Sequence, residues 1–244
     1  LLPESLKPGS GPAARGWFNL QAFRTALGRP YVGPLLGCIF FTTFAFAQFE
    51  NTLSLLTKSL GFTQRGNFYV FAYIGVVLTL AQGGLVRRLM PKIGEYRMAL
   101  IGVGLMTIGL ACLAFVSLPR EHQTATALLF VVLPIAVVGF SSTNPSLQSL
   151  LSLNTPEDEQ GGTLGVGQSM SALARILGPL LGLSLHSYNI ALPYWVGAGL
   201  MALSAVMIFP LSGAMAAKLP DAPDEPEDGG GGIFAEINIT PLTD

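Results

Sequence analysis

Long apolar runs alternate with short polar segments along this chain, and this alternation predicts its elements. Crossing a bilayer takes about 20 residues of α-helix, and six runs are long enough. We place these runs at 31–57, 67–90, 97–118, 124–151, 162–186 and 190–212. The segments between them are short and carry most of the charge, as in PKIGEYR and NTPEDEQ. The pattern predicts an all-α membrane protein with six transmembrane helices at 31–212.

Long soluble helices are the alternative interpretation, and the runs argue against it. Residues 127–139 read ALLFVVLPIAVVG and are apolar on every face. A helix on the surface of a soluble protein needs a polar stripe.

The two ends of the chain differ from the spanning region. Residues 1–30 are predicted to form a polar cytoplasmic linker. Within it, apolar residues fall near helical spacing, with arginines between them: Trp17, Phe18, Leu20, Phe23 and Leu27. This spacing is typical of an amphipathic helix on a membrane surface, with a plain loop as the alternative. Residues 213–244 include LPDAPDEPEDGGGG, an acidic Pro/Gly-rich stretch that cannot bury a core and predicts a disordered tail.

Basic residues predict the orientation, because cytoplasmic segments hold an excess of Lys and Arg. With the N-terminus in the cytoplasm, the inner segments hold nine: Lys7, Arg15, Arg24, Arg29, Arg87, Arg88, Lys92, Arg97 and Lys218. The outer loops hold three, Lys58, Arg65 and Arg120, and the remaining Arg175 lies inside a span. Both termini are therefore predicted to be cytoplasmic.

Composition narrows the function classes. The chain is 50% hydrophobic and 11% charged, whereas soluble domains carry about 25% charge. No Lys/Arg cluster offers a surface for nucleic acid. Cys38 and Cys112 lie in apolar runs and read as buried hydrophobes, and the isolated His122 and His186 match no metal-ligand spacing. No cofactor is predicted.

Glu50 is the strongest candidate for chemistry, because it is the sole acid in any of the six predicted spans. Gln48 and Asn51 stand beside it. Counting about 1.5 Å per residue from Pro34 places Glu50 roughly 24 Å deep, in the outer third of the bilayer core. Two readings stay open: a proton-coupling or cation-binding carboxylate, or a carboxylate that is paired with Arg175 or held by polar neighbours.

Arg175 is the basic counterpart, within GQSMSALARILGPLLG. A buried guanidinium needs an acceptor. Three acceptors for Arg175 stay open: Glu50, backbone carbonyls near Pro179, or an acid on a partner. Asn144, Gln148 and Gln168 are further polar side chains within spans, and they either bond neighbouring helices or line a substrate path.

Small residues recur at helix-packing intervals. Gly161-x-x-x-Gly165 and Gly178-Pro179-x-x-Gly182 predict close helix contacts, and Pro179 predicts a bend.

Several segments resemble the drug/proton antiporters of the major facilitator superfamily, in particular the tetracycline-efflux branch. LPESLKP and NLQAFRTALGRP resemble the central cytoplasmic loop of that family. GGLVRRLMPKIGEYRMALIG resembles its repeated signature loop, VGFSSTNPSLQSLLS its tenth helix, and GTLGVGQSMSALARILGPLLG its eleventh. The resemblance covers about residues 1–215.

The resemblance implies helices seven to twelve, the C-terminal half of a twelve-helix transporter that needs an N-terminal six-helix half. It implies proton-coupled efflux of a small drug-like solute, by alternating access, through a bacterial inner membrane, and no enzymatic activity. By analogy, Gly84, Arg88, Gly94 and Arg97 take the turn and basic positions of the signature loop. Arg87 stands where the family has an acid.

Residues 235–244, AEINITPLTD, resemble instead the start of ExbD/TolR proteins, with Asp244 at the functional aspartate. Three rivals therefore remain: a half-size homodimeric transporter, a non-transporting accessory protein of the ExbB/ExbD kind, and a membrane-embedded enzyme. The lack of a second acid within the spans disfavours the enzyme.

Overall fold

The computed structural model describes residues 24, 26–118 and 122–211, and every regular element within them is helical. The helices are α2 (Val32–Ser59), α3 (Gln64–Leu80), the π-helical η1 (Ala81–Val86), α4 (Arg87–Ile93), α5 (Glu95–Val116), α6 (His122–Leu153), α7 (Gln160–Tyr188) and α8 (Leu192–Ile208). The predicted all-α fold is confirmed. Most of the predicted surface helix in 1–30 and all of the predicted tail, with Asp244, lie outside the described residues.

Each predicted span coincides with a helix whose ends differ by a few residues. α3, η1 and α4 form one continuous helix from Gln64 to Ile93, so the separator PKIGEYR is largely helical rather than a loop. The turn is confined to Gly94, which adopts φ +80°, a conformation that favours glycine. α8 ends at Ile208, because Pro210 cannot donate the backbone N–H that would extend it.

Four of the described helices are long and apolar enough to cross a membrane: α2, the continuous α3–α4 helix, α5 and α6. α7 has 29 residues but is interrupted by polar residues and glycines, and α8 is apolar but has 17 residues. Six crossings therefore stay a prediction for the last two helices.

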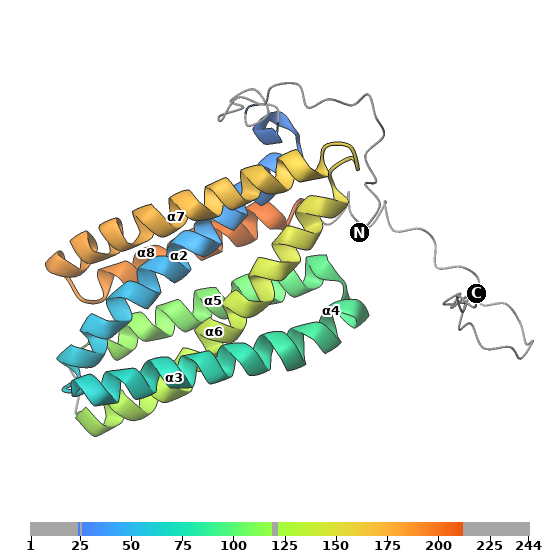
Figure 1. Ribbon diagram of the computed structural model, residues 1–244. Coiled ribbons are helices and arrows are strands. Elements are labelled where there is room, and N and C mark those ends of the chain that lie inside the picture. The colour runs from blue at the N-terminus through green and yellow to red at the C-terminus, as the bar shows by residue number, and fades with distance from the viewer. Residues whose placement is uncertain (1–23, 25, 119–121, 212–244) are drawn as a thin grey trace, which may run out of the picture.

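Successive helices run in alternating directions and pack side by side (Figure 1). α2 packs against α7 and α8, and α5 packs against α6 and α8. α3 lies at the edge and contacts mainly α6 and η1. The start of α5 and the end of α8 share one end of the bundle, where the Tyr96 hydroxyl donates to the Phe209 carbonyl at 3.1 Å.

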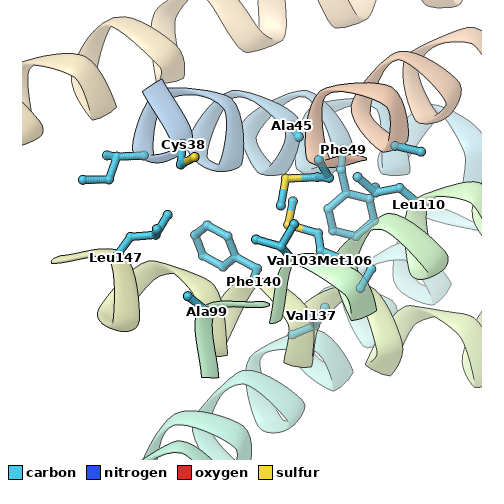
Figure 2. Packing of buried hydrophobic residues seen from close by; sticks show 14 of the residues in the cluster. Cys38, Ala45, Phe49, Ala99, Val103, Met106, Leu110, Val137, Phe140 and Leu147 are labelled. Carbon is cyan, nitrogen blue, oxygen red and sulfur yellow. The ribbon is translucent and has the colours of Figure 1, made fainter. Parts of the chain in front are cut away.

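The core lies between α2, α5, α6 and α8, and Figure 2 shows the part formed by α2, α5 and α6. Its buried side chains include Ala45, Phe49, Val103, Met106, Leu110 and Val137. Because lipid is as apolar as these side chains, the contacts stabilise the bundle through dense packing rather than through removal from water.

Glycines bring α5 and α6 into close contact. A Cβ on Gly109 would lie 2.5 Å from the Ala136 backbone nitrogen, and one on Gly102 would lie 2.8 Å from the Thr143 nitrogen. A Cβ on Gly139 would overlap the Met106 backbone. This crossing was not predicted, since the sequence does not show which way each helix is rotated.

Gly178 and Gly182 form the corresponding contact between α7 and α2. A Cβ on Gly178 would lie 3.0 Å from the Phe44 carbonyl oxygen, and one on Gly182 would lie 2.6 Å from Gln48 Cγ. Pro179 lies within the helix between them. Gly161 and Gly165 make no such contact among the described residues, where no atom outside their own helix turns lies within 4 Å of a Cβ at either position.

Candidate functional site

A cavity of about 620 Å³ opens between α2, α6, α7 and the continuous α3–α4 helix. Its wall carries five polar side chains, Glu50, Gln82, Arg87, Asn144 and Arg175. They come from four different helical segments, so the tertiary fold alone brings them together. Three of them, Glu50, Asn144 and Arg175, were predicted to lie on a substrate path.

The rest of the wall is apolar. Phe46 of α2 stacks on Phe140 of α6, with ring centroids 3.6 Å apart and ring planes inclined by 10°. Leu78, Val86 and Pro145 complete the wall. A concave surface of a few hundred Å³ that combines apolar side chains with convergent polar groups fits a small organic molecule that has both characters.

A smaller recess of about 40 Å³ brings Glu50 and Arg175 to one place. Thr43 also lines it, and the Thr43 hydroxyl is buried with no hydrogen-bond partner among the described residues. Glu50 and Arg175 share the recess without forming an ion pair. In the described part of the chain the ion pair is Arg29 with Glu159, 2.5 Å apart.

Helix geometry explains why these side chains converge. Thr43, Phe46, Ala47 and Glu50 are spaced at i, i+3, i+4 and i+7 on α2, which places them on one stripe. The π-helical turn η1 supplies Gln82 and Val86, and such turns occur frequently at functional sites.

Gln48 does not join this cavity. Its side chain is 1% exposed and lies between α2, α7 and α8, where Nε2 donates to the Pro193 carbonyl. Asn51 is exposed and donates to the Ala47 carbonyl of its own helix at 2.8 Å. The structure therefore does not bring Gln48 and Asn51 together with Glu50 on the wall of this cavity.

Gln148 and Gln168 also lie off the cavity wall, half-buried on α6 and exposed on α7 respectively. Gln82 and Arg87 are on the wall but were not proposed for it. Gln82 is a lone carboxamide within an apolar run, and that signal could have drawn attention to it.

No three His, Cys, Asp or Glu side chains gather at a metal-binding separation within the residues that the structure describes. The polar groups of the cavity are thus carboxylate, guanidinium and carboxamide groups, which bind and orient solutes through charge and hydrogen bonds.

Comparison with known proteins identifies the family. The model of the Major Facilitator Superfamily matches residues 1–179, well over half of the chain. The chain belongs to the Major Facilitator Superfamily. It is accordingly a multi-pass membrane protein of a transporter family, in agreement with its apolar helices.

Relatives within this superfamily include two resistance proteins. "Multidrug resistance protein 2" of Bacillus subtilis (strain 168) is 29% identical over 157 residues, which cover 64% of this chain and 37% of the relative. "Tetracycline resistance protein, class B" of Escherichia coli is 28% identical over 166 residues, 67% of this chain and 39% of the relative. "Hippocampus abundant transcript 1 protein" of Mus musculus is 26% identical over 185 residues, which cover 74% of this chain and 36% of the relative. The alignments span under two fifths of these relatives.

The four positions predicted to form a signature loop take different places in the fold. Gly94 forms the turn between α4 and α5, and Arg97 is exposed just after it. A chain turn was expected at Gly84. Gly84 lies instead inside the π-helical segment η1, which continues the helix, so the chain does not turn there. Arg88 is exposed on α4 and lies off the cavity wall.

Proposed function

We propose that this chain supplies one half of a secondary transporter that exports a small drug-like solute in exchange for protons. The observation that carries the proposal is the cavity, in which an intramembrane carboxylate, two guanidiniums and two carboxamides line a space of about 620 Å³. Charged groups inside a membrane are costly and mark solute or ion pathways. The names of two relatives add that proteins similar to this chain confer resistance to multiple drugs or to tetracycline.

A second six-helix half is the proposed partner. Two helices that border the cavity, α3 and α7, expose large apolar side chains. Leu80 is 68% exposed and Ile176 is 63% exposed. The alignments span 36–39% of the relatives, which leaves room in them for a further set of helices. In such transporters two halves alternate access to a central site.

The bacterial inner membrane, with both chain ends in the cytoplasm, is the proposed location. The argument is the nine-to-three excess of basic residues in the segments assigned to the inside. In the fold, the Arg29–Glu159 ion pair joins the start of α2 to the α6–α7 connection. Both segments were assigned to the inner side, so their contact supports the alternation of the helices.

Glu50 is the proposed proton carrier. We expect Glu50→Gln in the complete transporter to lower proton-coupled export by at least about tenfold, since the amide keeps the shape but cannot exchange a proton. Export is measured as drug uptake into everted vesicles under an imposed pH gradient, because eversion turns the cytoplasmic face of the membrane outward. Glu157→Gln is the matched control, because Glu157 is exposed in the α6–α7 connection and away from the cavity.

Two results would argue against this function. If Glu50→Gln exported drug at the full rate, Glu50 would not be the residue that couples export to protons. Robust transport by this chain alone as a monomer in liposomes would show that no second half is needed. Crosslinking identical positions between two copies in membranes would favour the homodimeric alternative, and a loss of function on deleting residues 219–244 would favour the accessory-protein alternative.

A further inference from the structure

The charges on the cavity wall do not balance. Among the described residues, the wall carries one carboxylate, Glu50, and two guanidiniums, Arg87 and Arg175. The wall therefore holds a surplus of one positive charge, and a charge within the span of a membrane is costly without a counter-charge.

The two guanidiniums differ in how near they lie to the carboxylate. Glu50 and Arg175 share the small recess, so the carboxylate has a positive neighbour already. Arg87 comes from the other side of the cavity, on the α3–α4 helix, and has no hydrogen-bond or ion-pair partner among the described residues. A cationic solute that approached Glu50 would meet Arg175 beside it, whereas an anionic solute would meet two donors.

The chemical groups on the wall restrict the class of solute further. A guanidinium is flat and donates a fork of hydrogen bonds that fits a carboxylate with two bonds at once. Phe46 and the largely buried Phe140 stack on each other and form an apolar part of the same wall, against which a flat ring of a solute would rest.

We infer that the cavity recognises an amphiphilic monoanion, an apolar and preferably aromatic body that carries one acidic group. The acidic group binds Arg87 and Arg175, and the aromatic body packs against Phe46 and Phe140. This inference rests on the proposed function and names the substrate class of the same site.

Three probes that share one apolar body test the charge preference. They are 1-naphthylacetate (anionic), 1-naphthylmethanol (neutral) and 1-naphthylmethylammonium (cationic). Binding is measured by calorimetry on the full chain in nanodiscs of neutral lipid, with empty nanodiscs to subtract partition into lipid. We expect the anion to bind at least about tenfold more tightly than the cation, as charge-assisted bonds to a guanidinium imply.

Variants assign the effect to the named side chains. We expect Arg175→Gln and Arg87→Gln each to weaken naphthylacetate binding about tenfold while binding of the neutral probe stays the same. Arg88→Gln is the matched control, because Arg88 is the exposed neighbour that does not line the cavity. We expect it to bind naphthylacetate as the unaltered chain does.

Two outcomes would overturn the inference. One is equal binding, or absence of saturable binding, for all three probes. The other is tighter binding of the cation that disappears in Glu50→Gln, which would make the cavity a cation site. Either result could occur with proton-coupled export intact, so failure of this inference is distinguishable from failure of the proposed function.

Discussion

At the residue scale, the environment of each polar side chain decides whether it shapes the fold or the cavity. Gln48 and Glu50 are two positions apart on α2, which corresponds to about 200° around the helix axis. Gln48 is therefore buried against α8, and Glu50 faces the cavity. Nearness in sequence is a poor guide to a shared site within one helix.

This difference gives a stability prediction. We expect Gln48→Ala to lower the free energy of unfolding by about 2 kcal/mol, because it removes packing against Gly182 and the buried hydrogen bond to the Pro193 carbonyl. Reversible unfolding in mixed detergent micelles measures the change.

Asn51→Ala is the matched control for that variant. Asn51 is exposed and bonds a carbonyl of its own helix, so we expect a change within about 0.5 kcal/mol. An equal or larger loss for Asn51→Ala than for Gln48→Ala would contradict the assignment of Gln48 to helix packing.

The sequence predicts some cavity residues better than others. Glu50, Asn144 and Arg175 stand out because a polar group in an apolar run is costly and needs a reason. Arg87 gave no such signal, since it lies at the end of a span, where basic residues are common. Only the packing of the α3–α4 helix against α6 brings it to the same cavity as Glu50.

At the element scale, apolar runs locate the helices but not their rotation. The six predicted spans coincide with helices because length and polarity are visible along the chain. Which glycine meets a neighbouring backbone depends on the rotation of the helix about its axis. For this reason the contact of Gly109 was missed, and Gly161 makes none among the described helices.

The crossing of α5 and α6 gives a second prediction. We expect Gly109→Ala to cost about 1–3 kcal/mol of unfolding free energy, since its Cβ would lie 2.5 Å from the Ala136 nitrogen and force the helices apart. The measurement is again reversible unfolding in mixed micelles.

Gly104→Ala serves as the control on the same helix, because nothing lies within 4 Å of a Cβ at that position. We expect it to be neutral or slightly stabilising. If both alanine variants unfolded alike, the close α5–α6 crossing would be wrong.

At the scale of the whole molecule, the described helices form a bundle with a polar, hollowed region and with large apolar side chains exposed on α3 and α7. Family membership establishes a multi-pass membrane protein of a transporter superfamily. The cavity within this bundle is what the proposed function depends on, because a transport path must admit water and solute into the span of the membrane.

Substituted-cysteine labelling tests that claim most directly. With Cys38 and Cys112 changed to serine, single cysteines replace Gln82 and Asn144 in the cavity, and Val131 and Val206 on exposed apolar positions of α6 and α8. A charged, hydrophilic methanethiosulfonate reagent is then applied to open membrane fragments, and the rate of labelling is measured for each cysteine.

Because the reactive thiolate forms only where water reaches the sulfur, we expect Gln82→Cys and Asn144→Cys to react at least about tenfold faster than Val131→Cys and Val206→Cys. Faster labelling at the cavity positions would establish a water-accessible path within the membrane. Equally slow labelling at all four positions would contradict the account, since the cavity would then be closed to water and solute alike.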